Sequence, residues 1–223
     1  MKYIGLFGLF MTLGLAENSR AQAPEVLHRN GYQLTILNQD QNFNPYLKKR
    51  MIQTFFEVYP KLAKAYNPKT AKAVTFIIDT AYTGVAEASA NEIKFSSKYM
   101  TTHPKDIDVV THEAMHVVQN YGNSMGPGWL TEGIADYVRF RYGVDNAGAN
   151  WSLPAFNASH SYENSYRIAA RFLVWIEKDT KPGMVRILNE ELTSHTFTPD
   201  SWKKLTGKTL QELWADYAKN PMI

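Results

Sequence analysis

The chain has 223 residues, of which 44% are hydrophobic, 13% aromatic and 20% charged. This composition fits one globular domain with a sizeable core and excludes the disordered and fibrous classes. The formal net charge of +3 is too balanced to indicate a nucleic acid or an anionic membrane as the partner.

The first residues predict a secretory signal peptide. Lys2 precedes an apolar run from Tyr3 to Ala16, and small residues follow that run. The run is shorter than the roughly 20 residues that span a bilayer, so a membrane anchor is the less favoured alternative. Cleavage after Ala21 leaves a predicted domain of residues 22–223, secreted or periplasmic and without a membrane anchor. This domain contains no cysteine, so we expect core packing rather than disulfides to stabilise it.

The strands are predicted in the first half of this domain. Alternating apolar residues predict a strand within Gly31–Asp40, and a β-branched run predicts a buried strand at Ala73–Asp79. Between them, apolar residues at spacings of three and four predict a helix at Pro45–Tyr66. A loop around Gly84 leads to another predicted strand at Asn91–Phe95.

The second half is predicted to be helical. A glycine-rich break separates the first two helices, and a loop rich in Asn, Gly and Ala precedes the third. The predicted helices are Asp106–Tyr121, Pro127 to about Tyr142, Tyr162–Glu177, and two short ones beginning near Thr198 and at Thr209. Strands early and helices late predict one α+β domain, whose two halves can face each other across a cleft.

The segment HEAMH has the pattern of a zinc site. His112 and His116 lie four residues apart on a predicted helix, so both imidazoles project from one face and can bind one zinc ion. Glu113 can then take a proton from a zinc-bound water, whose pKa falls towards roughly 7, and pass it to the leaving amine. The alternative is a solvated helix face. The core stripe on the opposite face and the predicted export weigh against that alternative.

A third ligand is predicted downstream. Glu132 lies sixteen residues beyond His116, and tetrahedral zinc with three protein ligands keeps one position open for water. Asp136 follows one helical turn later, where it can accept a hydrogen bond from a ligating imidazole and fix its tautomer. Two acidic residues on a wet helix face are the alternative. A zinc pattern with a third histidine does not fit, because Gln119 and Gly122 occupy its key positions.

Three segments carry a resemblance to a known family. DIDVVTHEAMHVVQ, GPGWLTEGIADYVRFRYG and TFFEVYPKLAKAYNPKTAKAVTFIIDTAYTGVAEAS resemble the plant and bacterial basic secretory protein family of metallopeptidases, from about Gly31 to Tyr217. The resemblance implies a zincin-like fold, with a small N-terminal sheet, an active-site helix and a mainly helical C-terminal half. The near-neutral charge departs from the family name and puts in doubt any function that depends on strong basicity.

The resemblance also implies an activity. It indicates a gluzincin-like zinc metalloendopeptidase that acts on peptides or proteins with one zinc ion. The implied ligands are His112, His116 and Glu132, with Glu113 as the catalytic base. The family carries a tyrosine in the segment that matches Tyr166, which makes this residue our first candidate for an oxyanion donor.

For the other candidate residues, a structural role explains the sequence as well as a functional role does. Tyr166 itself lies beside alanines and leucines, as core tyrosines do, and the weaker donor candidates are Tyr162, His160 and His195. The segment Tyr82–Phe95 can bind extended substrate through its main chain or be a plain loop and strand. Trp129 and Trp151 can line substrate pockets or pack in the interior.

Three functions remain open at this point. The first is hydrolysis of peptide bonds by a Glu-activated, zinc-bound water. The second is a secreted zinc-containing protein that binds peptides or glycans without turnover, although such a protein has no need of Glu113. The third is a zinc hydrolase that acts on another kind of bond.

Overall fold

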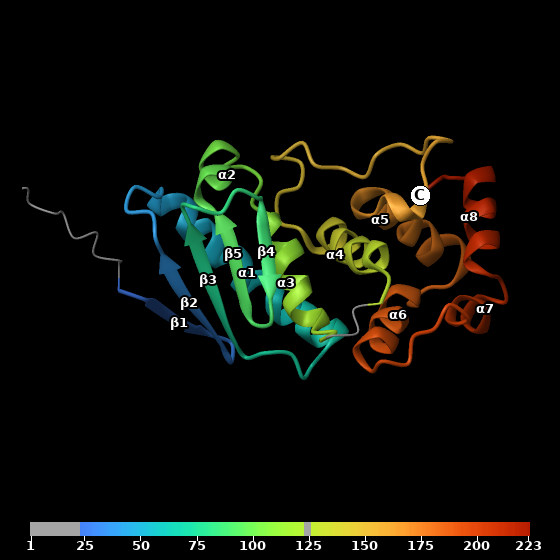
Figure 1. Ribbon diagram of the computed structural model, residues 1–223, viewed down its shortest axis with the longest axis horizontal. Helices are drawn as coiled ribbons and strands as arrows, with labels where there is room; N and C mark the ends of the chain where they lie inside the picture. The colour runs from blue at the N-terminus through green and yellow to red at the C-terminus, as the bar shows by residue number, and fades with distance from the viewer. Residues whose placement is uncertain (1–22, 123–125) are drawn as a thin grey trace, which may run out of the picture.

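The computed structural model describes residues 23–122 and 126–223, so the predicted signal peptide lies outside the described residues. A sheet with its helices forms one end of the molecule and a helical half forms the other, with α3 and α4 between them (Figure 1). The α+β class predicted from the sequence is therefore confirmed. No helix in the described ranges combines the length and the apolar character needed to cross a bilayer.

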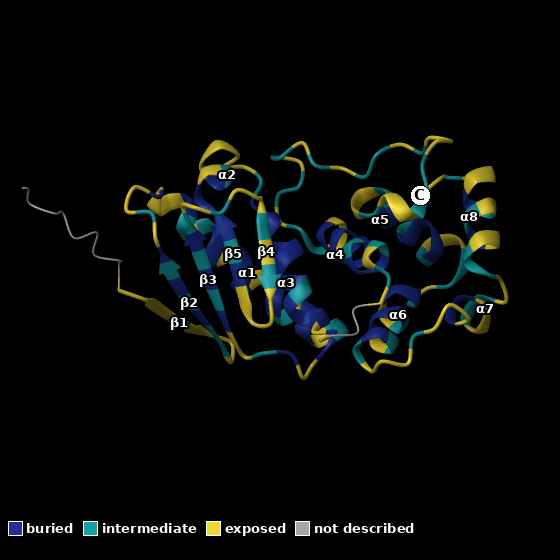
Figure 2. Ribbon diagram, viewed as in Figure 1, coloured by how far each residue is buried: buried dark blue, intermediate teal, exposed yellow. Residues whose placement is uncertain are grey.

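The sheet has five strands in the order β1-β2-β3-β5-β4. The inner strands β2, β3 and β5 run parallel to one another, and β1 and β4 pair antiparallel at the two edges. Their bounds are β1 (Glu25–Arg29), β2 (Tyr32–Asn38), β3 (Ala73–Asp79), β4 (Ala86–Ser89) and β5 (Glu92–Ser96). The sequence predicted the three inner strands. It missed both edge strands, because these have only four or five residues and neither contains a buried residue (Figure 2).

The long helix α1 (Pro45–Tyr66) packs on the sheet through its apolar face. Phe55 meets Phe76 of β3 edge to face at 5.3 Å between ring centres, and Tyr59 meets Tyr32 of β2 at 5.2 Å. The inward residues of β2 and β3 alternate along each strand and are buried, as the period of two requires. Helix α3 (Val109–Gln119) packs against α1 and runs beside β4. The sheet and α1 together fix the position of α3.

The short helix α2 (Ser97–Thr102) follows β5 and lies at the sheet end of the molecule, and α4 (Gly128–Tyr142) follows α3 (Figure 1). The helices of the C-terminal half are η1 (Tyr162–Asn164), α5 (Tyr166–Trp175), η2 (Ile176–Thr180), α6 (Met184–Thr193), α7 (Ser201–Thr206) and α8 (Leu210–Lys219). The sequence analysis missed α2 and α6. The prediction of a single helix at Tyr162–Glu177 is wrong. The helical conformation is interrupted at Ser165, between η1 and α5, and the C-terminal end of α5 continues into the π-helical turn η2. The predicted capping box of Thr209 and Glu212 starts α8.

Asp108 joins the start of α3 to the loop that follows α4. Its side chain is fully buried and accepts three hydrogen bonds. The donors are the Val144 amide at 2.8 Å, the Asp145 amide at 2.6 Å and the Thr111 hydroxyl at 2.7 Å. Both carboxylate oxygens are used, so this buried charge is compensated by donors that come from two separate segments. The loop after α4 is thereby anchored to the N-terminal end of α3.

Candidate metal centre

Helices α3 and α4 lie side by side and run in opposite directions. His116, near the end of α3, faces Glu132 near the start of α4, and His112, one turn earlier, faces Asp136 one turn later. Helix α4 packs closely against α5 at Gly133, where an added Cβ would lie 2.7 Å from the Cβ of Ala169. The glycine next to Glu132 therefore permits the close packing that holds this face of α4 towards α3.

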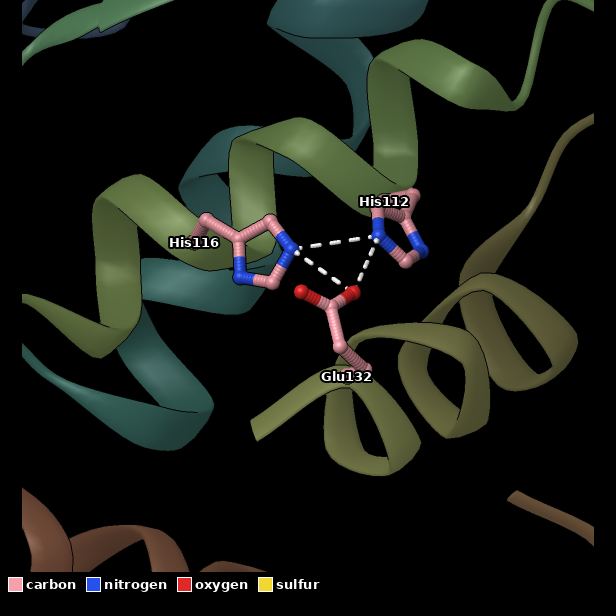
Figure 3. A group of neighbouring side chains, drawn as sticks. All are labelled: His112, His116 and Glu132. Carbon is pink, nitrogen blue, oxygen red and sulfur yellow. Dashed lines mark hydrogen bonds and ion pairs between the residues drawn. The ribbon is translucent and has the colours of Figure 1, made fainter. Parts of the chain in front are cut away.

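Three donor atoms converge between the helices. The Nε2 atoms of His112 and His116 are 3.1 Å apart, and Oε2 of Glu132 lies 3.2 Å from the first and 3.4 Å from the second (Figure 3). Ligands bound to zinc at about 2.0–2.1 Å in a tetrahedron are separated by about 3.3 Å. The donor set therefore has the size and the chemistry of a zinc site with three protein ligands.

Both histidines are oriented by partners on their other ring nitrogen. Asp136 Oδ1 accepts a hydrogen bond from Nδ1 of His112 at 2.7 Å, and Gln119 Oε1 accepts one from Nδ1 of His116 at 2.6 Å. Gln119 is itself fixed, because its Nε2 donates to the carbonyl of Thr131 at 2.9 Å. These partners direct each Nε2 towards the shared position. Asp136 was predicted for this role from the sequence. Gln119 was not, although its place three residues after His116 puts it on the same helix face.

The pKa values of His112 and Glu132 are shifted in opposite directions when no metal is bound. Burial lowers the pKa of His112, but hydrogen bonds to Asp136 and Glu132 outweigh burial and raise it to about 10. Burial raises the pKa of Glu132, but hydrogen bonds from His112 and His116 outweigh burial and hold it well below its usual range. The metal-free centre therefore binds a proton where a metal ion fits, next to an ionised carboxylate.

Glu113 lies beside the donor set without belonging to it. Its side chain is buried, with 6% of the residue exposed. Burial raises its pKa, and the nearby His112 and His116 oppose that rise. A carboxylate with a raised pKa holds and releases a proton nearer to neutral pH than an exposed one. Glu113 thus has the properties of a general base in a sheltered position.

Tyr166, the first residue of α5, lies beside His112. Its ring is nearly parallel to that of His112, with 6.2 Å between the ring centres, and 54% of the residue is exposed. The charge of Glu132 is the main cause of its raised pKa, followed by burial. Ser165 and Tyr166 both have left-handed φ values, 63° and 46°, which cost about 1–2 kcal/mol each for residues with a Cβ. The chain thus holds a strained conformation where it brings this hydroxyl towards the donor group.

One cleft, with a volume of about 1190 Å³, connects these residues. It is lined by the three donors, Glu113, Asp136, Tyr166, Trp151 and the edge strand β4. The weaker candidates Tyr162, His160 and His195 do not line it, and neither does Trp129. Tyr162 instead packs against Trp129, with 4.8 Å between the ring centres. The structure therefore brings together the main candidate residues and separates the weaker ones from them.

Residues 22–217 match the sequence profile of a family described as peptidase of plants and bacteria. The chain belongs to this family. The match confirms the resemblance to the basic secretory proteins noted above, and it makes the chain a member of a peptidase family. No curated protein sequence is significantly similar to the chain.

Several solved structures are similar to this family member. An aminopeptidase N family protein from Idiomarina loihiensis superposes with a TM-score of 0.56 at 13% identity, over 87% of this chain and 46% of its own. An M1 zinc metallopeptidase from Deinococcus radiodurans has a TM-score of 0.42 at 11% identity, over 90% of this chain and 47% of its own. The chain spans about half the length of these structures. The first likeness shows that the chain shares its fold with part of that aminopeptidase N family protein, and at this identity it shows the fold alone.

Proposed function

We propose that the chain is a secreted, zinc-dependent endopeptidase of the gluzincin type. One observation supports this most strongly: the donor atoms of His112, His116 and Glu132 converge beside the buried Glu113 in a cleft. A zinc ion held by these three residues would act as a Lewis acid on water and on the substrate carbonyl. The predicted signal peptide supports secretion.

The residues around the donors have distinct tasks in this proposal. Glu113 takes the proton of the attacking water and later delivers it to the leaving amine. Tyr166 donates a hydrogen bond to the oxyanion that develops on the substrate carbonyl. Asp136 and Gln119 hold the imidazoles of His112 and His116 in one orientation.

The shape of the cleft supports cleavage within a chain. Strand β4 (Ala86–Ser89) is the last strand of the sheet, so one of its edges is unpaired, and it borders the cleft. An extended peptide can pair with such an edge through its main chain. The cleft continues past the donors in both directions, towards Gly122 at one end and towards Trp151 at the other. A substrate can therefore extend on both sides of the bond that is cut.

The proposal is tested by measuring the zinc content and proteolysis of the purified chain. We expect one zinc ion per chain and cleavage of unfolded proteins at internal bonds, both abolished by a chelator. Zinc-loaded protein that binds peptides and cleaves none would favour the binding protein considered above. Release of single amino acids from the N-terminus alone would instead indicate an aminopeptidase.

A Tyr166→Phe variant tests the oxyanion donor. We expect kcat to fall by about 10²–10³, with KM and zinc content little changed, because the lost hydrogen bond forms mainly in the transition state. Steady-state kinetics on one peptide would measure this. Tyr162→Phe is the matched control, since Tyr162 lies outside the cleft. Equal activity of the two variants would exclude Tyr166 from this role.

Zinc binding is expected to release a proton. The pKa of His112 is raised to about 10 in the metal-free protein, so its imidazole is protonated at neutral pH and must lose that proton to bind a metal. The apparent zinc affinity should therefore rise as pH increases and level off above the pKa of His112. The stabilisation from the paired His112 charge is complete below about pH 6.5 and lost as pH rises through about 10.

Isothermal titration of zinc into metal-free protein at about pH 8, in buffers that differ in ionisation enthalpy, measures the protons released. We expect a clear dependence of the apparent enthalpy on the buffer. An apparent enthalpy that is the same in every buffer would contradict the prediction.

A further inference from the structure

The cleft has a defined region one helical turn beyond the donors. Val109 lies one turn before His112 on α3, and Arg139 lies one turn after Asp136 on α4. Both residues line the cleft. A helical turn advances about 5.4 Å, so this region lies beside the position of the reacting bond, one or two residues along an extended substrate.

Arg139 is held rigidly in this region. Only 5% of it is exposed. Its Nη2 donates to Asp106 and its Nε donates to Asn146 at 3.1 Å. Asp106 also accepts a hydrogen bond from the Tyr99 hydroxyl at 2.6 Å. Arg139 and Asp106 neutralise each other, so the pair offers no net charge to a substrate.

This fixed guanidinium supports the ring of Trp151. The Cζ atom of Arg139 lies 4.5 Å from the centre of that ring, the geometry of a cation–π contact. The Trp151 amide donates to the carbonyl of Asn146 at 2.9 Å, and the start of the same loop is anchored by Asp108. Trp151 is half-buried and lines the cleft. Contacts of both the side chain and the backbone thus fix the position of Trp151.

We propose that Trp151, with Val109 and Ala149, forms a subsite for a large apolar or aromatic side chain of the substrate. The proposal rests on the peptidase function above. A rigid aromatic ring binds an apolar group with little loss of conformational entropy, and the apolar Val109 and Ala149 line the same cleft. Trp151 is in this view a specificity-determining residue for the substrate position next to the scissile bond.

A peptide series tests the subsite. One parent peptide is varied at the positions on either side of the cleaved bond to Phe, Leu, Ala and Glu, and kcat/KM is measured for each. At one of these positions we expect Phe and Leu to exceed Ala by about 10- to 200-fold. Trp151→Ala should reduce that preference to less than about threefold, because kcat/KM falls for the Phe and Leu peptides alone. Trp151→Phe should retain most of the preference.

Two further variants keep the test independent of how well Trp151→Ala folds. Ala149→Asp places a carboxylate in the subsite and should lower kcat/KM for the Phe peptide while raising it for a Lys peptide. Trp129→Phe is the control, because Trp129 lies outside the cleft, and it should keep the preference of the parent chain. A preference for Glu would overturn the apolar subsite and indicate recognition by Arg167, an exposed cation that also lines the cleft.

Binding separates this proposal from the peptidase function. The Phe and Ala peptides are titrated into zinc-loaded Glu113→Gln protein with and without Trp151→Ala. Tighter binding of the Phe peptide that depends on Trp151 supports the subsite, even if the parent chain cleaves nothing and the peptidase proposal fails. Cleavage without any dependence on Trp151, or equal loss on all peptides, overturns the subsite alone. Peptides that neither bind nor react overturn both.

Discussion

A Glu113→Gln variant is expected to keep its zinc ion and to lose peptide hydrolysis by a factor of about 10²–10⁴. The amide has the shape of the carboxylate but cannot accept the proton of the attacking water. Burial raises the pKa of Glu113, so a neutral amide removes a buried charge and should not destabilise the chain. Metal analysis and kcat/KM on a single peptide measure the two effects.

Glu57→Gln is the matched control for this variant. Glu57 belongs to α1, lies outside the cleft and is exposed in an ion pair with Lys61. The same chemical change there should leave kcat/KM within about threefold, because exposed pairs contribute little. A Glu113→Gln protein that retained the activity of the parent chain would refute the proposed base.

Asp108→Ala is expected to lower the free energy of unfolding by about 3–5 kcal/mol. The substitution leaves the backbone amides of Val144 and Asp145 and the buried hydroxyl of Thr111 without their acceptor. It also releases the loop that carries Trp151. Denaturant unfolding of the metal-free protein measures the loss without a contribution from zinc binding.

Two control variants should lower the free energy of unfolding by less. Asp108→Asn keeps one acceptor oxygen and should cost less than the alanine variant. Asp216→Ala removes a carboxylate from a surface pair with Lys208 and should cost much less than Asp108→Ala. A loss at Asp108 as small as that at Asp216 would mean that water replaces the buried oxygens.

The sequence predicted the donor set because its geometry is local to two helices. The spacing of His112 and His116 fixes their common face, and the spacing of Glu132 and Asp136 does the same on α4. These spacings do not give the placement of the two helices relative to each other. That placement was inferred from the match to a known zinc-site pattern. Gln119 escaped the analysis because its contact with His116 follows from side-chain direction, which spacing alone does not give.

Features that depend on contacts between distant segments could not be predicted. Asp108 lay inside the helix predicted at Asp106–Tyr121, and only the folded chain brings the amides of Val144 and Asp145 to it. The periodicity after Tyr162 continued through Ser165 as if the helix were unbroken. The left-handed pair that turns Tyr166 towards the donors is a tertiary effect, which overrides local propensity.

The strand that borders the cleft also bears on sheet pairing between copies of the chain. An unpaired strand edge offers the same amides and carbonyls to another copy of the chain as it offers to a peptide. Strand β4 has only four residues and carries the charged Glu87. A short, charged edge gives a second sheet too few partners to extend, while a single flexible peptide can still pair with it. Replacing Glu87 with a β-branched apolar residue would therefore put solubility at risk.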